Sequence, residues 1–327
     1  MVQALSVPSL FQLGYYWEAK IFLTSVKLDL YTPLAEGPMT ADALAAAVEA
    51  DPSCLERMLD ALVSIGLLQR NAEGYANIPQ LAEFLVKTSR FYMGELMLLQ
   101  DAEWDHWGKL ENIIRTGRPA VSGNIFMNRP EIGATVLSVL DRMAKRVAPG
   151  LAERIDFSRS QNFIDIGGGA ATFSIAFCKR YPHLKAVLFD LPQTLPVASA
   201  NIRNAGLEER ISLVPGNFNR DPLPGRFDTV FLSDILHYQT AEENAALIQK
   251  LYHATQPGGS IVVKDMLIDS DDSRPGWNAV FSIHMMVYSE KGRCFKEDAV
   301  ATWLEKAGFQ DITKIERNTV MSATRPL

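Results

Sequence analysis

The spacing of hydrophobic residues changes near residue 160, so the two parts of the chain predict different kinds of structure. Over residues 1–150 the apolar side chains recur mostly at helical intervals. They are so dense over Leu10–Leu30 that we expect a helix buried on more than one side. Thr40 and Asp51 each precede a helical pattern and are expected to cap it, with Pro52 in the first turn of the second helix.

The region after Thr40 predicts the order helix, turn, helix, hairpin. Leu55, Leu59 and Leu62 share one face of the second helix. Ile65–Arg70 and Tyr75–Ile78 flank a turn and read as a small hairpin. This order is typical of a winged helix, so we predict a mainly α-helical, winged-helix-like domain at the start of the chain.

Beyond residue 160 the pattern alternates between short apolar strands and amphipathic helices, which predicts a mostly parallel α/β sheet. The helices are expected at about 171–180, 194–205, 241–255 and 296–307. The strands are expected at Asn162–Ile166, Ala186–Phe189, Ile211–Val214, Thr229–Leu232 and Ser260–Met266, followed by an antiparallel pair at Ile312–Glu316 and Thr319–Ala323.

Composition limits the class of protein. The 327 residues, 47% hydrophobic and 21% charged, fit a soluble globular protein of two domains. No apolar run reaches the ~18 residues that a membrane span needs, and Met1–Leu5 lacks the basic start of a secretory signal. The three cysteines are far apart, without metal-ligand spacing. We therefore expect a cytoplasmic protein with no membrane partner and no metal.

The charge of the N-terminal region opposes the DNA-binding role that a winged helix suggests. Residues 1–90 carry six basic and ten acidic side chains. This net negative charge has the wrong sign for a surface that contacts phosphates. We expect no nucleic-acid partner and interpret the domain as one for association or packing.

A glycine loop and an acidic residue at strand ends indicate a nucleoside-containing ligand. Asp165 lies in the first strand, and Gly167 and Gly169 follow it, where glycine lets the backbone approach a ligand closely. Asp190 ends the second strand, where a carboxylate can accept hydrogen bonds from both ribose hydroxyls.

Two features distinguish between possible cofactors. A dinucleotide-binding loop needs a third glycine where this chain has Thr172. The third strand ends in Gly216-Asn217-Phe218, whose amide and aromatic ring can contact the edge and face of adenine. Both features count against an NAD-dependent oxidoreductase, which we keep as an alternative.

With Leu236-His237 and Pro257–Gly259, these segments resemble the S-adenosylmethionine-dependent O-methyltransferase family that carries an N-terminal dimerisation domain. The family includes plant phenylpropanoid and acetylserotonin methyltransferases and bacterial antibiotic O-methyltransferases. The resemblance covers nearly the whole chain. It implies a Rossmann-like class I methyltransferase sheet of seven strands with a terminal antiparallel hairpin, preceded by the winged-helix-like domain.

The same resemblance implies three segments and a homodimer. Residues 1–100 would form the dimerisation domain, 101–150 a helical bridge that contributes to the substrate pocket, and 151–327 the catalytic domain. It also implies S-adenosylmethionine as cofactor and S-adenosylhomocysteine as product. The implied cofactor contacts are Asp165, Gly167, Gly169, Asp190, Leu191, Gly216, Asn217, Phe218 and Ser233.

His237 occupies the family's position for the general base, and Asp265 the position of a carboxylate that orients it. Chemistry supports the first role, because a hydroxyl acceptor must lose a proton and histidine, with a pKa near ~6.5, can take it at neutral pH. We therefore predict methyl transfer to a hydroxyl of an apolar aromatic small molecule, with His237 and Asp265 as the catalytic pair.

The chain departs from the family pattern around this pair. Tyr238 and Gln239 replace the frequent Asp-Trp after the histidine, and Cys294 replaces a second glutamate. These departures leave open a C-methyltransferase that acts on a ring carbon, for example of a tetrapyrrole. A non-catalytic winged-helix regulator and a metal-dependent methyltransferase are further alternatives, although the sequence shows no carboxylate cluster with ligand spacing.

The acceptor pocket is the least defined part of the prediction. The resemblance places the stretch around His284 and Met285 along this pocket, and Tyr238 next to the base. Trp104 and Met127 are further candidates for its wall. Core packing is the more ordinary role for Trp104, Met127, His284 and Met285.

Overall fold

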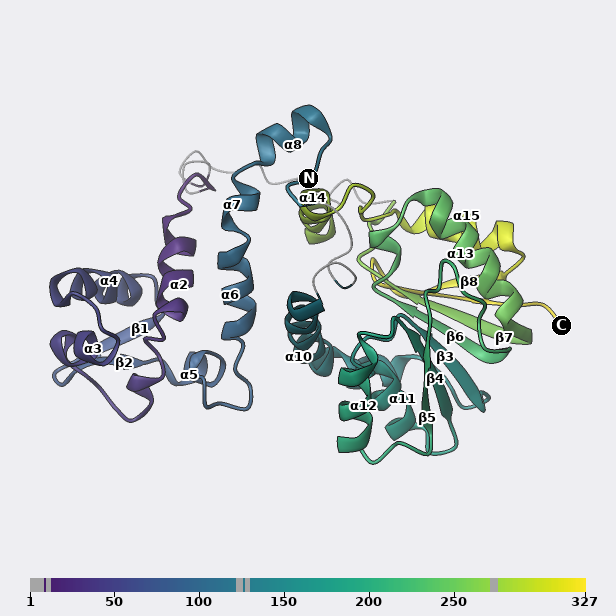
Figure 1. Cartoon of the computed structure of the whole chain (residues 1–327), viewed down its shortest axis with the longest axis horizontal. Helices are drawn as coiled ribbons and strands as arrows, with labels where there is room; N and C mark the ends of the chain where they lie inside the picture. Colours follow the sequence, from purple (N-terminus) through teal and green to yellow (C-terminus); the bar gives the residue numbers. More distant parts are fainter. Residues whose placement is uncertain (1–8, 10–12, 122–125, 127–129, 271–275) are drawn as a thin grey trace. The chain divides into compact units, whose positions relative to one another are not determined.

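The computed structural model describes residues 9, 13–121, 126, 130–270 and 276–327. The chain divides into two compact units, Met1–Gly108 and Lys109–Leu327 (Figure 1). Residues 101–150, predicted as a bridge, are shared between them, because α7 (Trp104–Trp107) lies in unit 1 and α8 (Leu110–Thr116) and α10 (Pro130–Arg154) lie in unit 2.

Unit 1 has the winged-helix-like order that the sequence predicts. Thr40 accepts a hydrogen bond from the Ala43 N–H at 3.2 Å, and Asp51 accepts one from the Cys54 N–H at 2.8 Å, so both predicted caps are confirmed. The elements of this unit are α2 (Trp17–Lys27), η1 (Pro33–Ala35), α3 (Ala41–Ala47), α4 (Pro52–Ser64), β1 (Leu68–Asn71), β2 (Gly74–Asn77), α5 (Pro79–Leu85), α6 (Gly94–Ala102) and α7.

The first helix is less buried than the sequence predicts. Within α2 only Leu23, Ser25 and Val26 are buried, and of these Val26 joins a core built from α3, α4 and the hairpin. The aromatic residues Tyr15, Tyr16 and Trp17 are exposed instead. The dense apolar pattern therefore exceeds what unit 1 itself covers; residues 10–12 of the predicted helix lie outside the described part of the chain.

Unit 2 contains a seven-stranded sheet in the order β5-β4-β3-β6-β7-β9-β8. The first five strands in this order are parallel, and β9 pairs antiparallel with both β7 and β8. The strands are β3 (Asn162–Ile166), β4 (Lys185–Asp190), β5 (Ile211–Pro215), β6 (Phe227–Ser233), β7 (Thr255–Lys264), β8 (Gln310–Glu316) and β9 (Val320–Thr324).

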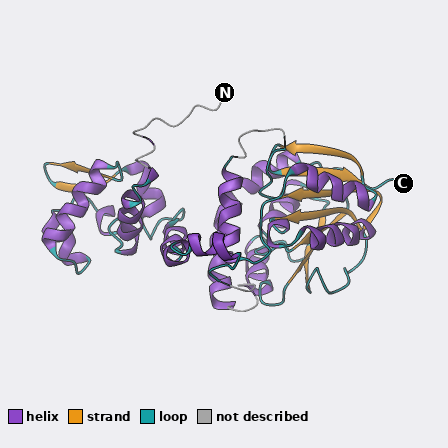
Figure 2. Cartoon of the chain, turned by 90° about the horizontal axis from the view of Figure 1, so that it is seen from above, coloured by secondary structure: helices purple, strands orange, loops and turns teal. Residues whose placement is uncertain are grey.

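Helices cover both faces of this sheet, as Figures 1 and 2 show. Side chains of successive strand residues point to opposite faces, so Phe163 and Ile164 in β3 enter different cores. Both faces are apolar, as in parallel sheets buried on both sides. One core is shared with α10, α11 (Thr172–Arg180) and α12 (Leu195–Asn204), and the other with α13 (Ala241–Ala254) and α15 (Glu297–Ala307).

The structure corrects the sequence prediction in two places that matter for the site. Strand β7 begins at Thr255 and ends at Lys264, so Asp265 follows the strand rather than ending it. Helix α14 (Trp277–Tyr288) was not predicted, because its residues are apolar almost all round and give no helical stripe. Among the residues that the structure describes, no helix has the length and apolar character needed to cross a membrane.

Candidate active site

The loop between β3 and α11 takes a backbone form that glycine favours. Gly167 and Gly169 have φ angles of +67° and +54°. A Cβ atom on Gly167 would lie 2.4 Å from the Ile235 side chain, so a larger residue there would displace its neighbours. The Gly167 N–H donates to the Phe189 carbonyl at 2.8 Å, which fixes the loop against β4. The loop thus presents its backbone at the carboxyl edge of the sheet.

Asp190, the last residue of β4, lies directly beside this loop. Its carboxylate accepts hydrogen bonds from the Gly169 N–H at 2.7 Å and the Leu191 N–H at 2.6 Å. Burial raises the pKa of Asp190, and the two backbone donors oppose that effect. The predicted strand-end acid and glycine loop therefore form one unit in which each fixes the other.

Asp165 lies against the glycine loop on its buried side. The carboxyl is fully buried, accepts a hydrogen bond from the Ser174 hydroxyl at 2.6 Å, and lies where a Cβ on Gly168 would meet it. Burial raises its pKa to about 7. Its second oxygen has no hydrogen-bond partner among the described residues. These contacts fit a supporting role more closely than direct contact with a ligand.

A cavity of about 410 Å³ opens next to Asp190, at the carboxyl ends of β4 and β5. Gly216 is required in its wall, because a Cβ there would lie 2.3 Å from the Phe189 ring. Asn217 accepts a hydrogen bond from the Asn219 N–H at 2.9 Å, so part of its acceptor capacity is already used. The cavity is lined by Leu191, Pro192, Gln193, Pro215, Gly216, Asn217, Arg220 and Asp221.

These features fit the nucleoside part of S-adenosylmethionine. A carboxylate beside a left-handed glycine turn is suited to a ribose diol, and the adjoining cavity has room for a flat base. Phe218 lies near the same loop, since its ring is 3.6 Å from where a Gly167 Cβ would be. Ser233 instead donates its hydroxyl to the Asp234 carboxylate at 2.9 Å.

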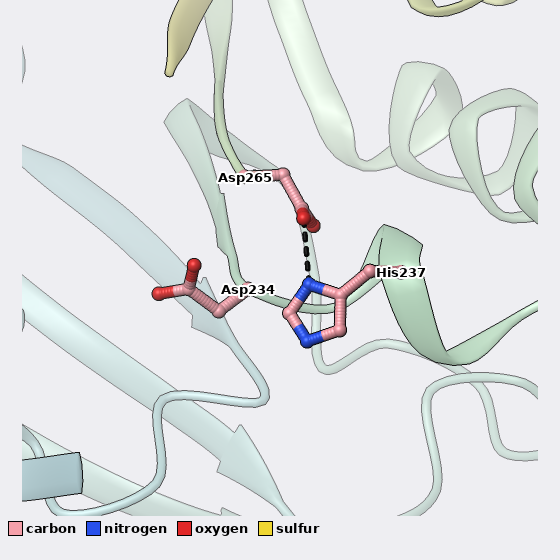
Figure 3. Close-up of side chains that lie close together, drawn as sticks. All are labelled: Asp234, His237 and Asp265. Atoms are coloured by element: carbon pink, nitrogen blue, oxygen red, sulfur yellow. Dashed lines mark hydrogen bonds and ion pairs between the residues drawn. The ribbon is translucent and has the colours of Figure 1, made fainter. Parts of the chain in front are cut away.

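The second half of the site lies at the ends of β6 and β7. His237, in η2 (Leu236–Tyr238), and Asp265 are only 3% and 1% exposed. His237 Nδ1 lies 2.6 Å from Asp265 Oδ1 (Figure 3). The Leu236 and Met266 N–H groups also donate to the Asp265 carboxylate, at 2.8 and 2.7 Å. The structure therefore brings together the two residues that the sequence proposes as a pair.

Burial and charge act on this pair in opposite directions. Burial by itself lowers the pKa of His237, but the neighbouring Asp265 carboxylate raises it, and the resulting pKa lies above the ordinary histidine value. The histidine in turn keeps the pKa of Asp265 low in spite of its burial. Nε2 lies on the opposite side of the ring from Asp265 (Figure 3), so it is the nitrogen left for other chemistry.

Asp234 is a third titratable side chain beside His237 and Asp265, and the sequence analysis did not predict it. Ligand atoms of Asp234, His237 and Asp265 lie within 4.8 Å of one another. Both Asp234 oxygens, however, bind the Lys264 ammonium, at 2.8 and 2.6 Å. The Asp234 carboxylate is already paired with Lys264, and His237 Nδ1 is already paired with Asp265. We therefore do not identify these residues as metal ligands.

Aromatic side chains of α14 and η2 lie beside His237. The Phe281 ring meets the imidazole edge-on at 5.3 Å, and the His284 ring stacks on Phe281 at 5.4 Å. Tyr288 continues this row, 4.8 Å from His284, and the Tyr238 ring is 4.3 Å from that of His237. Burial lowers the pKa of His284, with a contribution from His237.

The remaining pocket candidates are not part of this aromatic row. Met285 is buried on α14. Trp104 belongs to unit 1, where Lys20 lies over its ring, and Met127 lies outside the described residues. Cys294, at the position of the missing glutamate, is buried, and its N–H donates to Ser282.

The fold is that of a class I methyltransferase: a Rossmann-like sheet ending in an antiparallel hairpin, with a candidate nucleoside site at its carboxyl edge. The chain belongs to the O-methyltransferase family. The family model of the O-methyltransferase domain matches residues 110–310, and that of the O-methyltransferase dimerisation domain matches residues 11–88.

Individual proteins agree with this assignment. The chain is 30% identical to the tetracenomycin polyketide synthesis 8-O-methyltransferase TcmO of Streptomyces glaucescens, over 91% of this chain and 89% of that protein. It is 29% identical to the N,N-dimethyltransferase OxyT of Streptomyces rimosus, over 90% and 88%. A solved O-methyltransferase family protein from Burkholderia thailandensis superposes with a TM-score of 0.90 at 26% identity, covering 99% of both chains.

Family membership confirms the predicted enzyme class and fold. The chain is an S-adenosylmethionine-dependent O-methyltransferase with a dimerisation domain at its start. This finding replaces the oxidoreductase and the non-catalytic regulator that the sequence left open. The acceptor and the roles of individual residues do not follow from family membership.

Proposed function

We propose that this enzyme methylates a hydroxyl group of an apolar aromatic small molecule, with His237 as the general base. The observation that carries the proposal is the buried 2.6 Å contact between His237 Nδ1 and Asp265 Oδ1. A carboxylate at Nδ1 holds the proton on that nitrogen and leaves the lone pair on Nε2. Asp265 is then the positioning residue for the base.

The pair has the properties that proton removal requires. S-adenosylmethionine supplies an electrophilic methyl group on a sulfonium, and the acceptor oxygen becomes a better nucleophile as its proton leaves. Nε2 of His237 takes that proton, and the Asp265 carboxylate stabilises the imidazolium that forms. A positioned base of this kind contributes about 10²–10⁴ in rate, while alignment of oxygen and methyl accounts for most of the rest.

The surroundings of His237 favour an aromatic acceptor. Phe281 and Tyr238 place rings next to the base, and His284 and Tyr288 continue the row from Phe281, at centroid distances typical of aromatic packing. The similar protein TcmO is named for methylating a polyketide oxygen. A flat, hydroxylated ring system fits both observations, and Met285 is a further candidate for the wall.

For the cofactor we propose the following contacts. Asp190 holds the ribose, and Gly167, Gly169 and Leu191 present the backbone around it. Gly216, Asn217 and Phe218 flank the adenine, and Asp165 and Ser233 support the loop and the end of β6. The cavity beside Asp190 is what supports this arrangement.

We further propose a homodimer formed through unit 1. The family's dimerisation domain covers residues 11–88, and the exposed residues Leu13, Tyr15, Tyr16 and Trp17 lie within this segment. An exposed group of large apolar side chains at the start of a dimerisation domain is what a second copy would cover. Trp104, whose ring lies 5.8 Å from that of Tyr16, borders the same group.

The experiment combines a binding test and a product test. Calorimetry with S-adenosylhomocysteine should show one saturable site that Asp190→Ala weakens. Incubation with methyl-labelled S-adenosylmethionine and a panel of hydroxylated naphthalenes and anthraquinones should yield methoxy products, identified by NMR. Labelled products that carry a methyl group only on ring carbon, or only on nitrogen in the amino analogues, would replace the hydroxyl proposal.

A further inference from the structure

A second ion pair lies beside the proposed base, and the mechanism above uses neither of its members. Lys264 Nζ binds both oxygens of Asp234, at 2.8 and 2.6 Å. The Lys264 side chain is 14% exposed and that of Asp234 is 40% exposed. A largely buried lysine at the carboxyl edge of the sheet is costly unless its charge is paired. This pair therefore needs an explanation.

The pair joins the two strand ends that carry the proposed base and its partner. Ser233 and Lys264 are register partners at the ends of β6 and β7. The Asp234 N–H also donates to the Lys264 carbonyl at 2.8 Å, and Asp234 takes a left-handed backbone, with φ of +56°, where the chain turns toward His237. Asp265 follows Lys264 directly. The contacts between Asp234 and Lys264 therefore join the segment that leads to His237 with the strand that leads to Asp265.

The titratable groups around His237 come from several segments. Those beside it are Lys264 at the end of β7, Asp265 directly after it, Asp234 after β6, Tyr238 in η2 and His284 in α14. The Cys294 thiol is one step further away and interacts with the charge of Asp265.

Three of these groups are neutral near pH 7. Burial raises the pKa of the Tyr238 phenol far above its ordinary value and that of the Cys294 thiol to about 12. Burial lowers the pKa of His284, which keeps its imidazole uncharged. The two carboxylates and the one ammonium therefore decide the charge around His237.

These three charges sum to minus one. A neutral His237 leaves the cluster at minus one, and a protonated His237 brings it to zero. Burial and Asp265 have the largest effects on the pKa of His237. Asp234 and Lys264 have smaller ones: Asp234 favours the protonated imidazole and Lys264 opposes it. Without Lys264 the histidine would bind its proton more tightly, so less of it would be in the unprotonated form that acts as a base. Without Asp234 it would bind a proton more weakly.

We propose that Asp234 and Lys264 are positioning residues for His237: they hold the strand ends that carry the base and its partner, and their opposite charges set how strongly His237 binds a proton. The consequence for methyl transfer rests on the proposed function of His237. The effect on proton binding does not, so the two are tested separately.

The direct test is an NMR titration of His237 in the full-length protein with isotope-labelled histidine. The chain has five histidines, and the His237→Gln variant identifies the signal by its loss. Lys264→Met should make His237 bind its proton about tenfold more tightly, since the loss of one neighbouring charge in a partly buried site has an effect of that order. Asp234→Asn should weaken proton binding by a smaller factor, because Asp234 is more exposed. The double variant should return close to the wild type.

The chain provides a matched control pair. Asp29 also has a left-handed backbone, with φ of +57°, and pairs with Lys87 at 2.9 Å in unit 1. Asp29→Asn and Lys87→Met should leave the His237 titration unchanged. Lys264→Arg keeps the charge and should titrate like the wild type, which covers the case in which Lys264→Met does not fold. Calorimetry with S-adenosylhomocysteine shows that each variant retains its cofactor site.

A purely structural tie predicts a different result. Both single variants break the same ion pair, so they would then disturb His237 in the same direction or leave its titration unchanged. Either outcome overturns the proposal, as does a Lys264→Arg variant that titrates differently from the wild type. Methyl transfer that persists without His237 would disprove the base but would leave the titration result intact.

Discussion

The two halves of the sheet's carboxyl edge are built by different means. At β3 and β4 the site consists mainly of backbone: a left-handed glycine loop whose Gly169 N–H, together with the Leu191 N–H, donates to the Asp190 carboxylate. At β6 and β7 it consists of paired titratable and charged side chains, His237 with Asp265 and Asp234 with Lys264. A backbone site depends on shape, and a side-chain site depends on protonation. The first should therefore govern cofactor affinity and the second the rate of methyl transfer.

The largest separation is expected for His237→Ala. Turnover should fall by about 10²–10⁴, because the acceptor loses its base, while affinity for S-adenosylhomocysteine stays at the wild-type value. Single-turnover methyl transfer and calorimetry on the same preparation measure both quantities. Equal losses of affinity and rate would mean that the two halves do not act separately.

Asp190→Ala should produce the reverse pattern. Loss of two hydrogen bonds from ribose to a charged acceptor is expected to weaken S-adenosylhomocysteine binding by roughly 100-fold. At saturating cofactor the rate of transfer should recover most of its wild-type value. Asp190→Asn, which keeps one acceptor oxygen, is the control and should give an intermediate affinity; cofactor binding that survives Asp190→Ala intact would remove the ribose assignment.

Asp265→Asn is expected to have a smaller effect on rate. The amide keeps the shape of the carboxylate but not the charge that stabilises the imidazolium, so turnover should fall about 10–100-fold with unchanged cofactor affinity. Single-turnover rates at saturating cofactor measure this loss. A rate equal to that of the wild type would show that the contact with His237 Nδ1 has no part in catalysis.

Gly216→Ala tests the shape of the backbone half through its effect on stability. The added Cβ would lie 2.3 Å from the Phe189 ring, so the ring must move, at a cost of about 1–3 kcal/mol in the free energy of unfolding. Gly150→Ala is the control, because its Cβ meets only Arg154 at 3.7 Å and a helix favours alanine by roughly 1 kcal/mol. Urea unfolding of both variants should give changes of opposite sign; similar changes in both would show that the Phe189 ring adjusts freely.

The same contrast explains how much the sequence could predict. Strand β3 was predicted with its observed limits, and the glycine loop and Asp190 were found, because backbone conformation and strand ends leave local patterns. The alternation of short apolar strands with amphipathic helices along the chain likewise located all seven strands of the sheet. The His237–Asp265 pair came from family resemblance and not from periodicity.

What the sequence did not give was the second ion pair. Asp234 and Lys264 are 30 positions apart, and no local pattern relates them. Their contact depends on the parallel register of β6 and β7, which pairs Ser233 with Lys264. A charged residue at the end of each of two apolar strands is the one signal that was present. Helix α14 was missed for the opposite reason, because an evenly apolar segment has no period to detect.

The central claim is that His237 removes the proton of the acceptor, and the pH dependence of methyl transfer tests it most directly. A base works in its unprotonated form, so the single-turnover rate should rise with pH. The midpoint should lie above the ordinary histidine value of about 6.5, since Asp265 raises the pKa of His237. We expect His237→Ala to remove this rise and to leave a slow rate that does not change with pH in this range. A variant that keeps the same rise with the same midpoint would contradict the assignment of His237 as the base.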